Sequence, residues 1–286
     1  MDIIFDTYKR EGWLKIISSY VDMIPGMSKD EDIVMHFPGL TREEMLPLHV
    51  VSLACLIQSF YQDGFHHIFL DKTDVGNYLF DKLRFKEYWA GKKDYVASPD
   101  QKIFNLWRIS DETKENYGRA IADYLKCHFW KNKDLTSVQV SITEACYNTL
   151  DHANANGNAF SFVKYDEVTQ TLSVAVCDFG IGIARSVQGK LPECNDEQAL
   201  EKSIEVNFTV GSKSYNGGMG LDVIRNSVTK ELSLTIISNS AFLITKEEKV
   251  RTSKLDFEFR GTLIDFSINL SEYEDADEEL IDEISF

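Results

Sequence analysis

The sequence predicts an α/β protein made of two domains and an acidic tail. In residues 1–110, apolar runs of strand length alternate with helical patterns in the order β-α-β-α, which implies parallel strands joined by a crossover helix. In residues 111–270, two long helical patterns precede a predicted β-hairpin, and further strands follow. A length of 286 residues is enough for one large domain or two ordinary ones.

The composition fits a globular protein and excludes one class of partner. Hydrophobic residues make up 43% of the chain, which is typical of a folded protein. The net charge of −16 argues against nonspecific binding to nucleic acids, because phosphate contacts need a basic surface. The longest apolar run, residues 46–60, is shorter than the roughly 20 residues that cross a bilayer. We therefore expect a cytoplasmic protein with reduced cysteines that binds neither nucleic acid nor membrane.

The first domain, residues 1–110, is predicted from the spacing of its apolar residues. The expected elements are a helix over 9–23, a strand over 32–37, a helix over 46–62, a strand over 65–70 and a helix over 75–89. Pro25-Gly26 ends the first helix and Gly64 ends the second. The polar stretch 91–108 marks the domain junction. Within it, residues 104–107 are expected to dock as an interdomain strand or as a partner contact.

A predicted helix over 137–152 carries the first candidate site residues. Glu144 and Asn148 are four residues apart, so both side chains lie on one face of the helix, one turn apart. A carboxylate can orient and deprotonate an attacking water molecule. An amide oxygen one turn away can coordinate Mg²⁺, which prefers oxygen ligands. The alternative interpretation is an ordinary surface pair.

A second motif ends a predicted β-hairpin formed by residues 159–164 and 171–177. The motif reads Asp178-Phe-Gly-Ile-Gly182. A carboxylate at a strand end can accept a hydrogen bond from the exocyclic amine of adenine, which GTP lacks at that place. Gly180 and Gly182 allow positive φ and a close approach of the backbone to a base.

A third motif, Gly217-Gly-Met-Gly-Leu221, opens a predicted helix over 222–228. Free backbone N–H groups at a helix N-terminus favour phosphate. Residues 184–216, which precede the motif, are expected to form a lid. Lys213 is the best candidate in it to reach a terminal phosphate, and a solvated lysine is the alternative interpretation. The motif has no GK[ST] sequence and is no GxGxxG turn, which separates it from Walker A and Rossmann sites.

The chain closes with predicted strands and an acidic tail. Strands are expected over 232–238, 241–245, 257–259 and 261–268, with a charged turn over 246–254. The tail, residues 271–286, holds eight acidic residues and no basic ones. It is either a solubilising segment or one that folds on a partner.

In this order and on these elements, the three motifs resemble the nucleotide site of the GHKL superfamily, which includes gyrase, Hsp90, histidine-kinase and MutL ATPases. The resemblance covers residues 115–270 and implies a two-layer α/β sandwich of the GHKL (Bergerat) type, with helices on one face of a mixed sheet. It also implies ATP and Mg²⁺ as ligands.

The resemblance further implies a role for each candidate residue. Glu144 would be the catalytic base, and Asn148 would hold Mg²⁺. Asp178 and Thr262, the latter in a Gly-Thr pair that opens the last strand, would read adenine. Contacts to the base and the phosphates would come from Gly180, Gly182, Lys213, Gly218, Gly220 and Leu221.

The first domain resembles a smaller N-terminal α/β STAS-like domain, the fold of anti-sigma-factor antagonists. That family carries a phosphoacceptor Ser between a strand and a helix, whereas the matching stretch here reads Thr41-Arg-Glu-Glu-Met-Leu-Pro47 and contains no Ser. Phosphorylation of this domain is therefore not expected. A plain packing or docking domain is the alternative interpretation.

These observations predict an ATP-driven regulatory switch that acts on a partner protein, and they leave a homodimer open. Two other functions stay open. One is a Ser/Thr protein kinase of the anti-sigma-factor type, and the other is a non-catalytic interaction scaffold. A histidine kinase with an acceptor in the same chain is disfavoured, because the only candidate, His128, is followed by Phe129 and Trp130 rather than by an acidic residue.

Overall fold

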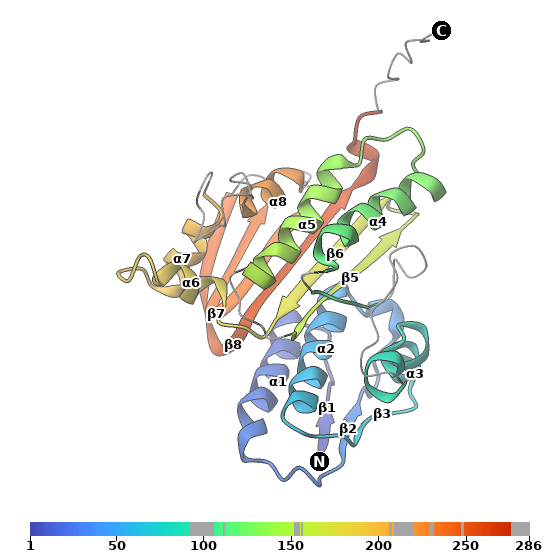
Figure 1. The fold of residues 1–286 in the computed structure, drawn as a ribbon, viewed down its shortest axis with the longest axis vertical. Coiled ribbons are helices and arrows are strands. Elements are labelled where there is room, and N and C mark those ends of the chain that lie inside the picture. The colour runs from blue at the N-terminus through green and yellow to red at the C-terminus, as the bar shows by residue number, and fades with distance from the viewer. Residues whose placement is uncertain are drawn as a thin grey trace, which may run out of the picture.

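The computed structural model describes residues 1–91, 106–110, 112–151, 155, 157–205, 208, 220–228, 232–246 and 249–275. In this part of the chain, a small parallel sheet, a pair of helices, a larger antiparallel sheet and a second set of helices follow one another as layers (Figure 1). We call residues 1–91 the N-terminal unit and residues 106–275 the C-terminal unit. The predicted boundaries at residues 110 and 270 stay a prediction.

The N-terminal unit is built around a three-stranded parallel sheet in the order β1-β2-β3. The strands are β1 (Asp2–Ile4), β2 (Ile33–His36) and β3 (Ile68–Leu70), and the helices are α1 (Arg10–Met23) and α2 (Pro47–Gln62). Helix α2 joins β2 to β3, so the predicted crossover is confirmed. Strand β1 was not predicted, because three residues are too few to show a periodic pattern.

The predicted helix over 75–89 is wrong as one continuous element. It begins as α3 (Asp74–Asn77), capped by the side chain of Thr73, and continues as two π-helical turns, Tyr78–Lys82 and Glu87–Gly91. Between the two turns, Arg84 has a φ of 62°, in the left-handed region that interrupts a helix. An apolar pattern alone does not reveal such a break.

The C-terminal unit contains a five-stranded sheet in the order β4-β5-β6-β8-β7. Its strands are β4 (Trp107–Arg108), β5 (Ala159–Asp166), β6 (Thr171–Asp178), β7 (Ser233–Lys246) and β8 (Lys249–Asn269). All described pairs are antiparallel, so the expectation of a mixed sheet is wrong. The predicted hairpin of β5 and β6 is confirmed. Trp107 lies in the edge strand β4, and a strand was one of the two alternatives expected for residues 104–107.

Strands β7 and β8 form one long hairpin where the sequence predicts four shorter strands. The two strands pair from Leu234 with Phe266 to Lys246 with Lys249, and the register shifts on both sides of Asn239. This bulge bends the hairpin, and Gly261 has a φ of 83° on the strand opposite. The predicted charged turn over 246–254 is therefore mostly strand, since charged side chains are tolerated on the exposed face of a hairpin.

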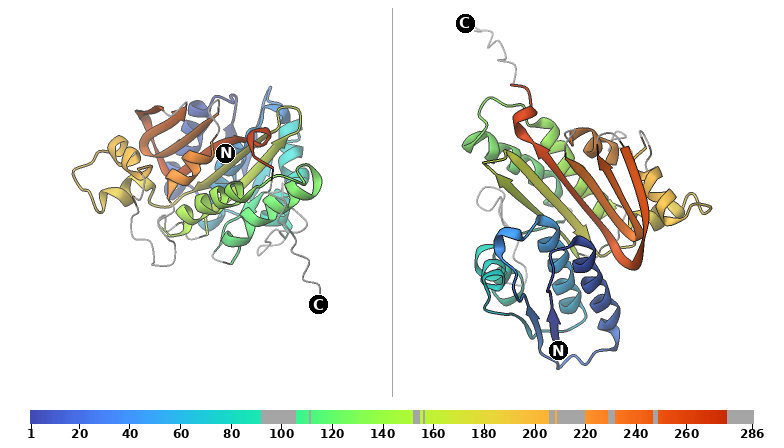
Figure 2. Two further views of the ribbon diagram at one scale, coloured as in Figure 1. Left: turned by 90° about the horizontal axis from the view of Figure 1, so that it is seen from above. Right: turned by 180° about the vertical axis from the view of Figure 1, so that it is seen from behind.

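Helices cover both faces of the five-stranded sheet. On one face lie α4 (Lys114–His128), α5 (Thr136–Asp151), α6 (Ile183–Gln188), α7 (Asp196–Ser203) and α8 (Leu221–Ser227). Helices α1 and α2 pack against the opposite face (Figure 2). Strand β6 shows the alternation: Val174 and Val176 belong to the core under α5, whereas Ala175 and Cys177 belong to the core under α2. The N-terminal unit therefore extends the expected two-layer sandwich, with α1 and α2 as a third layer and its parallel sheet beyond them.

Polar contacts cross the boundary between the two units. The guanidinium of Arg10 on α1 lies 2.8 Å from the carboxylate of Asp265 on β8. The Asn158 side-chain amide donates to the carbonyl of Cys55 at 3.1 Å and to the hydroxyl of Ser59 at 2.9 Å, both on α2. The units therefore share one buried boundary, with hydrogen bonds inside it. Across the described residues, no helix has both the length and the apolar character that crossing a bilayer requires.

Replacing Phe160 should destabilise both units together. The Phe160 side chain is completely buried on β5 and belongs to the core that includes α2. We expect Phe160→Ala to lower the free energy of unfolding by about 3–5 kcal/mol, as for other buried Phe side chains. Urea denaturation followed by circular dichroism should show one transition. Val168→Ala is the control, because Val168 is 93% exposed and its loss should cost less than about 0.5 kcal/mol. Two separate transitions would contradict a shared core.

Candidate functional site

Helix α5 presents Glu144 and Asn148 together. The Asn148 side-chain amide donates to the backbone carbonyl of Glu144 at 2.9 Å and lies 3.4 Å from its Oε1. Both residues are half-buried, whereas Ala145 and Cys146 point into the core and are fully buried. The structure therefore brings the two side chains to one face of the helix, as their spacing predicts.

The contacts of Asn148 with Glu144 leave its side-chain oxygen, Oδ1, available. Its Nδ2 atom makes both contacts with Glu144, and no hydrogen bond among the described residues uses its Oδ1 atom. The described residues hold no group of three or more His, Cys, Asp or Glu side chains that could bind a metal. A metal ion at Asn148 would therefore take most of its ligands from a bound molecule and from water, as Mg²⁺ does with nucleotides.

Asp178 ends β6 as a buried carboxyl group that is only half satisfied. Its Oδ1 accepts a hydrogen bond from the N–H of Gly180 at 2.8 Å, whereas its buried Oδ2 has no partner. The residue is 1% exposed, and this burial raises the pKa of Asp178 to about 8. At neutral pH the group is mostly protonated. A donor that reached Oδ2 would stabilise the charged form and would lower the pKa again.

A cluster of polar side chains holds the turn that follows Asp178. Thr262 pairs with Asp178 across β6 and β8, and its hydroxyl accepts from the N–H of Ile183 at 3.0 Å. Asn239 Oδ1 accepts from the N–H of Arg185 at 3.3 Å, and Asn239 Nδ2 donates to the carbonyl of Ile181 at 3.1 Å. These bonds satisfy N–H groups in the first turn of α6, which have no partner inside the helix.

Two members of this cluster, Ser238 and Asn239, were not predicted from the sequence. The hydroxyl of Ser238 lies 3.2 Å from that of Thr262 and donates to the carbonyl of Gly261 at 3.0 Å. Asn239 has a φ of 53°, which Asn tolerates better than most residues. The available signal was a polar pair that interrupts two apolar stretches of β7, since such a break is typical of a bulge.

Gly182 is required by this packing, whereas Gly180 is not in the expected conformation. Gly182 has a φ of 87°, and a Cβ atom there would lie 2.7 Å from Ser238 Oγ and would also collide with Asn239 Oδ1. The prediction of positive φ is therefore confirmed for Gly182. It is wrong for Gly180, which is not among the described glycines with positive φ and whose N–H instead bonds to Asp178.

The third motif is described only in part. Lys213 and Gly218 lie outside the described residues, as do residues 209–219 as a whole. Gly220 precedes α8, and its N–H donates to Asp222 Oδ1 at 3.2 Å. The side chain of Leu221 is 3% exposed and belongs to the core, so only the backbone of Leu221 can meet a ligand.

Chain connectivity brings these elements to one edge of the sheet. Residues 152–158 connect the end of α5 to the start of β5, where Ala159 pairs with Asp178. The end of α5 and the end of β6 therefore lie at the same edge, which is the lower edge of the sheet in Figure 1. The hydroxyls of Ser141 on α5 and Ser227 on α8 are 2.8 Å apart, near the opposite edge where β7 begins. Helix α8 thereby packs against α5.

A comparison with protein families gives one match in this region. Residues 111–234 match the family model of the histidine kinase-like ATPase domain. The match includes α5, the turn after β6 and the start of α8, and it supports a GHKL-type ATPase domain that binds ATP. Thr262, Ser238 and Asn239 lie beyond the matched residues, although the structure places them against the turn. No protein in a collection of curated proteins matches the chain.

Asp178→Asn should change how the stability of the nucleotide-free protein depends on pH. The pKa of Asp178 is about 8 in the folded state and near 3.8 when unfolded, so folding binds a proton between these values. The stability that this proton gives to the folded wild type is complete below about pH 4 and is lost as the pH rises through 8. Each unit of pKa difference corresponds to about 1.4 kcal/mol. Between pH 5 and pH 9, the free energy of unfolding of the variant should rise by at least about 1.4 kcal/mol relative to that of the wild type, as measured by urea denaturation. A constant difference would contradict a buried, protonated carboxyl group.

Gly182→Ala should destabilise the turn without removing any side chain. The Cβ atom would collide with Ser238 and Asn239, and the positive φ would be strained. We expect a loss of about 1–3 kcal/mol in the free energy of unfolding, measured by thermal denaturation. Gly26→Ala is the matched control, because nothing lies within 4 Å of a Cβ atom at Gly26. Equal effects of the two substitutions would refute the close packing described at Gly182.

Proposed function

We propose that the C-terminal unit binds ATP together with Mg²⁺ and that the chain acts as a nucleotide-driven regulatory switch on a partner protein. The observation that carries this proposal is the buried Asp178 carboxyl group, whose Oδ2 has no hydrogen-bond partner. Such a group is costly to keep in a core unless a ligand supplies the missing donor. The exocyclic amine of adenine is such a donor.

Recognition of the base would rest on Asp178 and Thr262. The amine of adenine would donate to Asp178 Oδ2, and the N–H of Gly180 would keep Oδ1 in place. GTP carries an oxygen acceptor instead of this amine, so the same carboxylate selects adenine over guanine. Because the donor favours the charged carboxylate, ATP binding should release the proton that Asp178 holds near neutral pH.

Binding of the phosphates would rest on the elements at the same edge. Asn148 Oδ1 is the proposed Mg²⁺ ligand, because Nδ2 is already used by Glu144. Bound Mg²⁺ would neutralise phosphate charge. The proposed phosphate contacts are Gly218 and the backbone at Gly220 and Leu221, from the third motif, and Lys213 from the segment that precedes it.

Glu144 is the proposed general base. Its carboxylate lies 3.4 Å from Asn148 Nδ2, and this contact would hold the side chain in position. A half-buried carboxylate at this place would orient a water molecule and accept its proton. Few residues are needed, because phosphoryl transfer depends mostly on positioning and electrostatics.

A contact between the units supports the regulatory part of the proposal. The N–H of Phe179, next to Asp178, donates to the carbonyl of Asn158 at 3.1 Å. The side chain of Asn158 in turn bonds to α2 through Cys55 and Ser59. Ordering of the turn by nucleotide would thus be felt at α2. We propose the N-terminal unit, in its STAS-like role, as the part that addresses the partner.

The test is a calorimetric titration of the protein with ATP and Mg²⁺. The wild type should bind ATP and not GTP, and Asp178→Asn should weaken ATP binding at least about tenfold, since it removes a charged hydrogen bond. Titrations in buffers of different ionisation enthalpy should detect proton release at pH 7. Glu144→Ala should still bind ATP and should lose about 10²-fold or more of hydrolysis.

Three other outcomes would change the assignment. A folded wild type that fails to bind ATP would overturn the proposal and would leave an interaction scaffold. Transfer of radiolabelled phosphate from ATP to a Ser or Thr of a partner protein would replace the switch with a kinase. Binding that Asp178→Asn leaves unchanged would remove Asp178 from the base site.

A further inference from the structure

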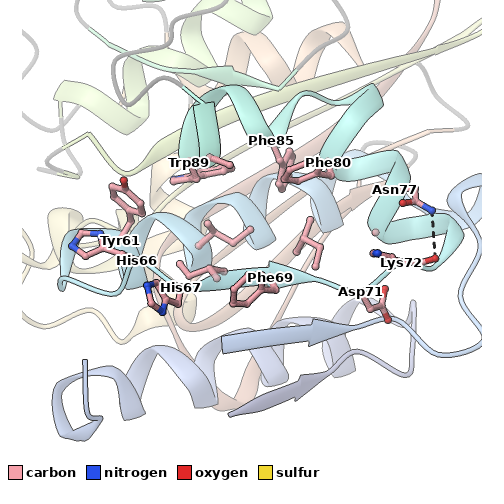
Figure 3. Close-up of a pocket in the computed structure, with 15 residues that line it drawn as sticks. Tyr61, His66, His67, Phe69, Asp71, Lys72, Asn77, Phe80, Phe85 and Trp89 are labelled. Carbon is pink, nitrogen blue, oxygen red and sulfur yellow. Dashed lines mark hydrogen bonds between the residues drawn. The ribbon is translucent and has the colours of Figure 1, made fainter. Parts of the chain in front are cut away.

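A second cavity lies in the N-terminal unit, outside the nucleotide site. It has a volume of about 590 Å³ and lies between β3, α2 and the two π-helical turns (Figure 3). Ile57 and Tyr61 come from α2, Phe80 and Trp89 come from the two turns, and Phe85 lies between the turns. We call this cavity the β3 pocket. Its volume is within the range of cavities that hold small organic ligands.

The middle of the β3 pocket is apolar and carries large exposed side chains. Phe85 and Ile57 are buried, whereas Phe80 is 40% exposed and Phe69 is 51% exposed. In Figure 3, Trp89, Phe85 and Phe80 form a wall opposite Phe69 on β3. Two half-exposed Phe side chains in one concave site favour an apolar ligand, because a ligand would remove them from water.

One end of the β3 pocket carries a lysine that can meet an anion. Asp71, Lys72 and Asn77 lie at the end opposite Tyr61 and His66 in Figure 3. Asp71 is already used, since it accepts from the N–H of Phe37 at 2.9 Å and from the Thr73 hydroxyl at 2.5 Å. Lys72 is exposed and forms no ion pair with any residue that the structure describes.

The edge of β3 adds a second donor at this end. In the parallel ladder, the carbonyl of His67 and the N–H of Asp71 bond to β2, so the backbone groups of Ile68 and Leu70 point away from β2. Neither N–H has a hydrogen-bond partner in the described part of the chain. The N–H of Leu70 and the ammonium of Lys72 can therefore both meet one carboxylate.

We propose that the β3 pocket binds an elongated apolar carboxylate, with its carboxylate at Lys72 and Leu70 and its chain along the wall of Phe80, Phe85 and Trp89. A medium-chain acyl carboxylate has this chemistry. The lining of the pocket fits such a ligand. Its apolar surface lies along the wall, whereas Lys72, the only unpaired charge among the described lining residues, lies at one end. The inference does not depend on nucleotide binding.

Trp89 connects the wall of the β3 pocket to the C-terminal unit. Its indole N–H donates to Gln58 Oε1 on α2 at 3.0 Å, and its ring lies 5.6 Å from the ring of Phe160 on β5. A ligand against this wall would therefore touch a side chain that also packs on the five-stranded sheet.

The test is displacement of 1-anilinonaphthalene-8-sulfonate from the full chain, measured by its fluorescence. This probe has an aromatic body and an anionic group, and decanoate should displace it. Lys72→Gln should weaken decanoate binding about fivefold and Phe80→Gln about tenfold, through a lost charge contact and lost apolar contact. Lys82→Gln and Ile4→Gln are matched controls, because both residues are exposed in the same unit and lie outside the pocket. They should change binding less than about twofold.

Decylamine, which has the same chain and the opposite charge, separates anion recognition from nonspecific hydrophobic binding. It should compete at least about fivefold more weakly than decanoate with the wild type, and this preference should vanish in Lys72→Gln. The proposal is overturned if decanoate fails to displace the probe. It is also overturned if decylamine competes equally or if Lys82→Gln matches Lys72→Gln. All variants should keep the circular dichroism spectrum of the wild type.

Discussion

The burial of α2 between two sheets is the constraint on which the rest of the structure depends. Of its 16 residues, 14 are buried, and its polar side chains are bonded inside the core. A helix that is apolar nearly all round needs partners on every side. It shares a core with Ile3, Ile33 and Met35 of the short parallel sheet, and it also packs on β5 and β6. This explains why a sheet of only three short strands is stable, and why the five-stranded sheet is covered on both faces.

The candidate nucleotide site depends on a bend in the same five-stranded sheet. The bulge at Asn239 and the positive φ of Gly261 turn polar groups of β7 and β8 toward the end of β6. Ser238, Asn239 and Thr262 then hold the turn after Asp178 through its backbone. The turn is thus ordered before any ligand is present. Asp178 Oδ2, in contrast, has no hydrogen-bond partner among the described residues, and a buried carboxyl oxygen without a donor is costly.

The proposed nucleotide site and the β3 pocket lie on opposite sides of the five-stranded sheet. Asp178 faces the helices on one side of the five-stranded sheet, whereas Trp89 and α2 pack on the other side. Asn158 bonds to α2 and to the turn beside Asp178, and it is buried between them. Packed side chains and hydrogen bonds therefore connect the two units directly at their boundary.

The sequence by itself determined the local features: the parallel strands joined by α2, the β5–β6 hairpin, and the Glu144 and Asn148 pair on one face of α5. These follow from periodicity and short spacing, which act within a few residues. Only the tertiary structure decided the antiparallel order of the sheet, the break at Arg84, the packing of the N-terminal unit as a third layer, and the roles of Ser238 and Asn239. These depend on contacts between residues far apart in the chain, such as Asn239 with Ile181, and on burial, which alone raises the pKa of Asp178.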